Sequence, residues 1–169
     1  NLIKQFCDEL HVIIPYKAHS TATLIALGAS SILMTKQATL GPIDPSVNGP
    51  LNPQMPGPNA MARVPVSVES VSSYLEFAKS IGIQSEPEVS KLVLYLAARI
   101  NPLVLGNVYR SRSQIRMLGR RLLAGHMQDQ SKIDKILDFL CSESGSHDYT
   151  INRREAANEL GLTITKPDD

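Results

Sequence analysis

Residues 11–34 constrain the fold more than any other stretch of this sequence. Apolar and β-branched residues predict a strand over 11–15, and a polar turn that reaches Ser20 leads into a predicted helix over 20–28. A second strand is expected over 30–34. Parallel neighbouring strands need a crossover element between them, so this order of elements predicts an α/β fold with short parallel strands.

Composition sets limits on the class of protein. The chain has 169 residues, of which 43% are hydrophobic and 20% charged, enough for a single domain with a real core. The formal net charge of +1 gives no general argument for binding nucleic acid or an anionic membrane. Cys7 and Cys141 lie in apolar helical patterns without a CxxC motif, which predicts buried thiols. The four histidines show no paired-ligand spacing, so neither a metal nor another cofactor is expected.

The beginning of the chain predicts a helix over 2–9, because Leu2, Ile3 and Phe6 recur at helical spacing. The sequence opens at Asn1 without a methionine, and we expect that a preceding strand of the domain is missing. No apolar run is long enough to span a bilayer, and no signal peptide is visible. Localisation therefore stays open between the cytoplasm and a membrane reached through a segment outside this sequence.

The stretch 41–66 is rich in proline and glycine. It holds seven of the eleven prolines, a composition that excludes a helix or a central strand. A functional lid or binding loop and a flexible linker are both consistent with such a stretch.

The region 67–169 is predicted to be mostly helical and to complete a single domain over 1–169. Ser67, Ser131 and Asn152 are expected helix caps, Ser131 together with Asp134 as a capping box. Asn101 precedes a proline and should break a helix. The expected helices cover 67–82, 88–100, 103–126, 132–141 and 152–161, with a short strand over 162–165.

Five arginines give the predicted helix over 103–126 a basic side, on which Arg112, Arg116 and Arg120 follow one another at intervals of four. A solvated face, or a subunit contact paired with carboxylates, explains such a row. A nucleic-acid interface would be favoured by interleaved aromatic residues and a basic net charge, which the sequence lacks.

Ser20 is the candidate nucleophile. At the start of a helix its hydroxyl lies near unpaired backbone N–H groups and the positive end of the dipole, which stabilise an oxyanion. Serine is also a preferred N-cap residue, so a purely structural capping role is the alternative.

A nucleophilic serine needs a base and a group that orients the base. His147, in the polar turn SGSHDYTI, is a candidate base or simply a turn histidine. Asp44, in GPIDP, follows the second strand, where α/β folds bind ligands, and could orient a histidine or form an Asx turn. Asp148 is a rival orienting group that is poorly placed because it adjoins the histidine. Lys17 and Lys36 are alternative bases, provided that their amines are neutral and desolvated.

Three segments resemble a known family. YKAHSTATLIALGASSILMTKQATLGPIDP is similar to the nucleophile segment of the serine dehydrogenase proteinase family, distant relatives of Clp protease and signal peptide peptidases with the Clp/crotonase fold. NPLVLGNVYRSRSQIRMLGRRLL and SHDYTINRREAANELGL are similar to that family's helical region and carboxyl-terminal motif. The proline-rich loop matches little.

The resemblance implies a serine peptidase that acts on peptides or proteins and forms a homo-oligomer. It implies a triad of Ser20, Asp44 and His147. The family's glycine-rich oxyanion segment lies upstream of this sequence, and loss of such a donor costs about 3 to 4 kcal/mol in the transition state. Signal peptide peptidases use a downstream lysine instead, a position for which Lys79 and Lys91 are in range. A non-catalytic assembly module is the alternative function, and acyl-CoA chemistry ranks last because no phosphate-binding signature is present.

Overall fold

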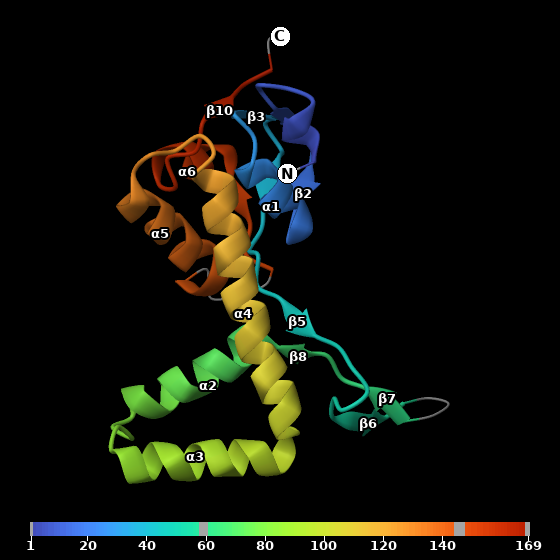
Figure 1. Ribbon diagram of the computed structural model, residues 1–169, viewed down its shortest axis with the longest axis vertical. Helices are drawn as coiled ribbons and strands as arrows, with labels where there is room; N and C mark the ends of the chain where they lie inside the picture. Colours follow the sequence, from blue (N-terminus) through green and yellow to red (C-terminus); the bar gives the residue numbers. More distant parts are fainter. Residues whose placement is uncertain (1, 58–60, 144–147, 168–169) are drawn as a thin grey trace. The chain divides into compact units, whose positions relative to one another are not determined.

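The structure is a computed structural model that describes residues 2–57, 61–143 and 148–167. The chain divides into two compact units, Asn1–Asp44 with Ile115–Asp169, and Pro45–Gln114 (Figure 1). Each unit has its own hydrophobic cluster, and each is described by itself.

A parallel sheet forms the centre of the first unit. Strands β1 (His11–Ile14), β3 (Ser31–Met34) and β10 (Ile164–Thr165) pair in the order β1-β3-β10, and helix α1 (Thr21–Leu27) lies between the first two along the chain. The predicted α/β class with short parallel strands is confirmed, as are the predicted strands over 11–15, 30–34 and 162–165.

A second small sheet of the first unit was not expected from the sequence. Strands β2 (Lys17–Ala18), β4 (Thr39–Leu40) and β9 (Ile151–Asn152) pair in the order β2-β4-β9, the first pair parallel and the second antiparallel. Two-residue strands carry too little sequence periodicity to be predicted. This sheet positions the turn at Ser20, which follows β2.

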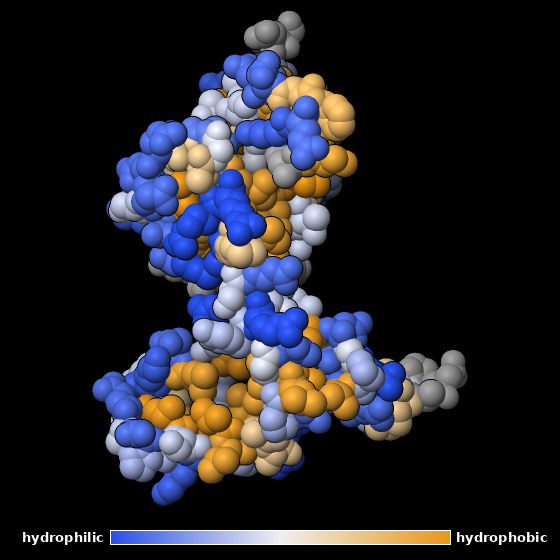
Figure 2. Space-filling view, viewed as in Figure 1, coloured by the Kyte–Doolittle hydropathy of each residue, from blue (hydrophilic) through white to orange (hydrophobic). Residues whose placement is uncertain are grey.

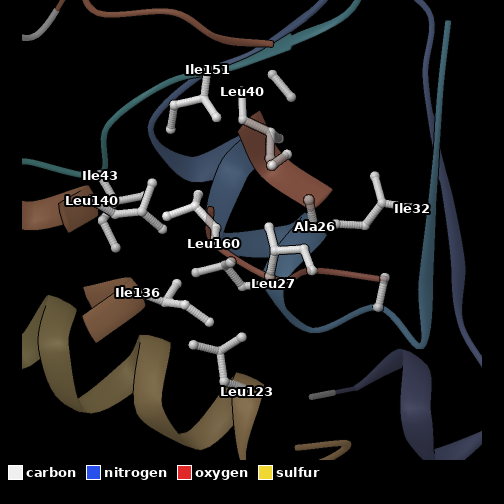
Figure 3. Close-up of a cluster of buried hydrophobic side chains, with 14 of the residues drawn as sticks. Ala26, Leu27, Ile32, Leu40, Ile43, Leu123, Ile136, Leu140, Ile151 and Leu160 are labelled. Carbon is white, nitrogen blue, oxygen red and sulfur yellow. The ribbon is translucent and has the colours of Figure 1, made fainter. Parts of the chain in front are cut away.

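Side chains from both sheets and from several helices fill the core of the first unit. The helices are α5 (Gln130–Asp138), the π-helical turn η2 (Phe139–Glu143), α6 (Arg153–Asn158) and the end of α4 (Pro102–Leu123). Leu27, Leu123, Ile136 and Leu140 are almost completely buried and point toward one another (Figure 3). Burial of a leucine or isoleucine contributes about 1.5 to 3 kcal/mol.

Two helix predictions in the first unit are wrong. Only Ile3–Gln5, a single 3₁₀ turn, forms within the expected helix over 2–9, and Phe6 remains 83% exposed. A helix this short has little stability unless an apolar face is packed against a neighbour. The expected cap at Ser131 is replaced by Asp129, whose carboxylate accepts the Lys132 N–H at 3.1 Å, so α5 begins at Gln130.

The second unit combines two antiparallel ribbons with helices. Strands β5 (Ser46–Val47) and β8 (Val66–Ser67) form one ribbon, and β6 (Gln54–Pro56) and β7 (Met61–Arg63) the other. The buried amide of Asn52 donates to the carbonyls of Val47 and Val64 at 2.7 and 2.9 Å. The proline-rich stretch is therefore ordered in part, without a central strand, as its composition predicted.

Helices α2 (Val68–Ser80), α3 (Glu86–Arg99) and the first part of α4 complete this unit. Ser67 caps α2 as predicted, because its hydroxyl accepts the Ser70 N–H at 3.1 Å. At the predicted break before Pro102, α3 and α4 meet at 108°.

Helix α3 has no buried residue, and Leu94 on it is 70% exposed. Figure 2 shows that apolar side chains gather on one face of this helical region. Among the described residues no single helix is long and apolar enough to cross a bilayer, although the bent pair of α3 and α4 meets that test by length and composition.

Candidate active site

Ser20 lies in a sharp turn between β2 and α1. Its backbone has φ 52° and ψ −116°, and it is the only non-glycine residue with positive φ in the described part of the chain. Such a conformation costs of the order of 1 to 3 kcal/mol and persists only where surrounding contacts impose it. The side chain makes no capping hydrogen bond, so Ser20 occupies the N-cap position without acting as a cap.

Backbone contacts impose this conformation. The Ser20 N–H donates to the Pro42 carbonyl at 3.1 Å, and the Ser20 carbonyl accepts the Leu24 N–H at 3.1 Å. One side of the turn is thus bound to the segment after β4, and the other side belongs to α1. In α/β-hydrolases, a nucleophilic serine lies in a strained strand-to-helix turn of this kind.

Thr23 connects the three segments around the turn. Its side chain is completely buried, and Oγ1 lies 2.7 Å from the Ala18 carbonyl oxygen and 2.8 Å from that of Gly41. Its hydroxyl oxygen also accepts the Gly41 N–H at 3.3 Å. These contacts fix the end of β2, the first turn of α1 and the end of β4 relative to one another.

The imidazole of His19 packs against the backbone of Gly41. A Cβ atom at position 41 would lie 2.5 Å from His19 Cγ, closer than non-bonded carbon atoms approach, so only glycine fits there. Nε2 of His19 is shielded from solvent and has no hydrogen-bond partner among the described residues. Reasoning from the sequence considered this histidine only as a possible metal ligand. The one signal that could have singled it out is its position directly before Ser20.

Asp44 lies next to the same network. It is 7% exposed and follows Pro42, which accepts from Ser20, and Ile43, whose N–H donates to the Leu140 carbonyl at 3.0 Å. The structure therefore brings the Ser20 turn and the segment of Asp44 into direct contact through their backbones. The same segment is bound to the turn η2.

His147 lies outside the described residues. On either side of it in the sequence, Phe139 and Tyr149 contact each other edge to face, with ring centroids 5.9 Å apart. The Tyr149 hydroxyl donates to the buried carboxylate of Glu155 at 2.7 Å, and this hydrogen bond raises the pKa of Tyr149 above its ordinary value of 10. Asp148, the rival orienting group, is exposed.

The four candidate lysines are all exposed. Lys17 lies over the Tyr16 ring, with Nζ 5.5 Å from the ring centroid, and Lys36 follows β3. Lys79 forms an ion pair with Glu76 at 2.9 Å, and Lys79 and Lys91 belong to the second unit. A lysine that acts as a base is normally desolvated, which none of these positions provides.

The arginines in the row on α4 each contact a polar side chain of the unit to which that arginine belongs. Arg116 binds Asp138 at 2.6 Å, Arg120 binds Asp134, and Arg112 donates to the Ser72 hydroxyl at 3.1 Å. Arg116 and Arg120 are thus paired with carboxylates of the same chain, and whether this face also takes part in a subunit contact stays a prediction. Within the described ranges no three His, Cys, Asp or Glu side chains are grouped in a way that could hold a metal ion.

One family model matches the first part of the chain. Residues 1–64 match the model of a family described as ClpP-like SDH-type serine proteinase, and this segment contains both Ser20 and Asp44. The resemblance predicted for the nucleophile segment is therefore confirmed over these residues.

A relative extends the similarity beyond that segment. The chain is 43% identical over 162 residues to the uncharacterized protein MJ0137 of Methanocaldococcus jannaschii, a match that covers 96% of this chain and 46% of the relative. The chain thus spans about half the length of the curated relative that it matches. No solved structure matches it.

Proposed function

We propose that the protein is a serine endopeptidase in which Ser20 is the nucleophile. The observation that carries this proposal is the positive φ of Ser20 in a strand-to-helix turn where its hydroxyl does not cap the helix. A serine that only capped α1 would adopt the extended backbone and the side-chain hydrogen bond that Ser67 shows at α2. The match of residues 1–64 to a serine proteinase family agrees with this role.

The proposed reaction is acyl transfer through a Ser, Asp, His triad. Ser20 Oγ attacks the peptide carbonyl while His147 takes the hydroxyl proton and passes it to the leaving amine. Water then attacks the acyl-enzyme, with the same histidine as base, and releases the carboxylic acid and Ser20. Asp44 holds the imidazole in the required orientation.

The contacts around Asp44 support its place in this triad. The aspartate is buried, and its segment is hydrogen-bonded both to Ser20 and to Leu140 in η2, which precedes His147 in the sequence. A Ser/Lys mechanism has less support, because Lys17, Lys36, Lys79 and Lys91 are all exposed.

The test is covalent labelling of the complete protein with a fluorophosphonate probe, with the modified peptide located by mass spectrometry. Wild type and the control Ser73→Ala, which changes an exposed serine of the second unit, should be labelled at position 20, and Ser20→Ala should not be labelled. Failure of the folded wild-type protein to react would contradict the proposal.

The base is identified by a second comparison. We expect His147→Ala to abolish peptide hydrolysis, while Lys36→Ala and Lys79→Ala keep most of it. The reverse order would replace the triad by a Ser/Lys pair.

A non-catalytic assembly module is the second candidate function. The exposed apolar surface of α3 favours self-association, whichever function is correct. If partner binding survives Ser20→Ala and the complete protein hydrolyses no peptide, the assembly function is the correct one.

A further inference from the structure

A second polar site lies in the first unit, apart from Ser20. Helix α6 and strand β10 border a pocket of about 370 Å³. It is lined by Arg153, Arg154, Ala157, Asn158, Ile164 and Lys166. Three of these six side chains are cationic, and none is a carboxylate.

The periodicity of α6 explains why the cations have no acidic neighbour in the pocket. Residues at i and i+4 share a helix face, so Arg153 and Arg154 share theirs with Ala157 and Asn158. Glu155 lies on another face, where it is buried and accepts from Tyr149. Within the described ranges, none of the ion pairs involves Arg153, Arg154 or Lys166.

Arg153 is held in place by the sheet. Its side chain is half-buried, and Nη1 donates to the Met34 carbonyl at 3.3 Å, at the carboxyl end of β3. A guanidinium has five N–H donors, so most of them remain for a ligand. A positioned arginine beside two further cations fits carboxylate oxygens.

Strand β10 adds a backbone feature to these charges. It is the last strand in the order β1-β3-β10, so its outer edge is unpaired in the described part of the chain. An extended peptide can add to such an edge through main-chain hydrogen bonds, and its alternate side chains then point to one side. Lys166 directly follows β10, next to the place where these side chains would lie.

We propose that this pocket binds the carboxylates of an acidic, extended peptide segment that pairs with the edge of β10. The further statement that the segment belongs to a substrate rests on the proposed peptidase function. Arg153 directly follows β9, and β9 is separated from β2, which leads into Ser20, by β4 alone. Because β9 runs antiparallel to β4, Arg153 lies at the opposite end of this sheet from Ser20. Two strand spacings of about 5 Å and an offset of about four residues along the strands give roughly 16 Å, a length that about five extended residues cover. The site would thus favour substrates with acidic residues about five positions from the cleaved bond.

Binding is tested first, by fluorescence anisotropy on the complete Ser20→Ala protein. The probe is a labelled eight-residue peptide rich in glutamate, and the reference is the same peptide with glutamine. The glutamate peptide should bind at least about tenfold more tightly, and Arg154→Glu with Lys166→Glu should remove that preference. The control, Arg110→Glu with Lys135→Glu, makes the same change in net charge at exposed positions and should leave binding within about twofold.

Three outcomes would overturn the site. These are equal binding of the two peptides, equal loss in both double variants, and displacement of the peptide by micromolar inorganic phosphate, which would indicate a small-anion site instead. Arg154→Gln with Lys166→Gln serves as the milder variant, with folding checked by circular dichroism.

Hydrolysis by the wild-type protein then separates the two proposals. Selective binding without any hydrolysis retains the pocket and rejects the peptidase function. Hydrolysis of both peptides at equal rates, unaffected by the double variant, retains the peptidase and rejects the pocket as a substrate site.

Discussion

Ser20 has a backbone conformation that favours glycine, and the resulting strain can be measured as a difference in the free energy of unfolding. At φ 52° its Cβ is strained, yet the contacts to Pro42 and Leu24 keep the turn in place. When a functional residue is kept at a strained position, the protein has a lower free energy of unfolding than it would have with a residue that fits that backbone conformation.

We expect the free energy of unfolding of Ser20→Gly to be about 1 kcal/mol higher than that of Ser20→Ala, because glycine relieves the strain and alanine retains it. Urea denaturation of the two variants measures this difference. Both should be unreactive toward the fluorophosphonate probe. A glycine variant less stable than the alanine variant would mean that the turn is not strained.

Thr23 tests the contacts that support the site. Thr23→Val keeps the shape but removes the hydroxyl that lies between the Ala18 and Gly41 carbonyls, so we expect a loss of about 1 to 3 kcal/mol and slower labelling of Ser20. Thr23→Ser keeps the hydroxyl and should retain the labelling rate. Equal labelling by both variants would show that this hydroxyl does not position the nucleophile.

Some of these residues were accessible to sequence reasoning and others were not. Ser20 and Asp44 could be proposed because local turn chemistry and the ends of strands point to them. The contact of His19 with Gly41 could not, because it joins residues of two different strand ends and depends on tertiary packing. Whether His147 is the base stays a prediction.

At the scale of elements, the helices with strong local signals were predicted well. Ser67 and Asn152 cap α2 and α6 as expected, and the break at Asn101 is present. The missed elements include the two-residue strands of the β2-β4-β9 sheet, which exist only because distant segments meet, and the short ribbons β5-β8 and β6-β7. The helix over 2–9 failed for the opposite reason, since its apolar pattern is clear in the sequence but no residue of the turn η1 is buried.

The correction at α5 gives a direct test of local capping. Asp129→Ala should lower the free energy of unfolding by about 1 kcal/mol, since it removes the acceptor for the Lys132 N–H. Ser131→Ala lies inside the helix and should change stability by less than about 0.5 kcal/mol. Chemical denaturation measures both, and a larger effect at Ser131 would restore the original prediction.

Tyr149 makes the stability of the segment before α6 depend on pH. The hydrogen bond to Glu155 raises the pKa of Tyr149 in the folded state above 10, so the phenol binds its proton more tightly when folded. This stabilisation is complete below pH 10 and is lost as the pH rises through the higher folded pKa.

We therefore expect the stability difference between wild type and Tyr149→Phe to be constant up to about pH 9 and to shrink above pH 10. Denaturant unfolding at several pH values measures it, and the other tyrosines cancel in the comparison. A difference that does not change with pH would mean that the phenol titrates normally.

At the scale of the whole molecule, the apolar face of α3 is the feature that most needs a partner. Leu94 is 70% exposed on a helix without any buried residue, and an apolar surface of this kind is typical of subunit contacts. The sequence suggested assembly through apolar strips on several predicted helices and through its resemblance to a family. The structure adds a surface on which the proposal can be tested.

We expect the complete protein to sediment as an oligomer and Leu94→Glu to shift it toward smaller species, because a charge buried in a contact is costly. Gln37→Glu adds the same charge at an exposed position of the first unit and should leave the assembly unchanged. A monomer by analytical ultracentrifugation, at concentrations up to the micromolar range, would contradict the proposal.

The two cysteines of the first unit differ in accessibility to solvent, so the alkylation rate of one can serve as a reference for that of the other. Cys141 is a thiol in the core beside Leu140, as the sequence predicted, whereas Cys7 is half-exposed next to the 3₁₀ turn η1, so its predicted burial is wrong. A maleimide can alkylate Cys7 in the native protein, but it reaches Cys141 only when the core opens locally. The ratio of the two alkylation rates therefore reports how often the core around η2 opens, with Cys7 as the internal reference for the reagent.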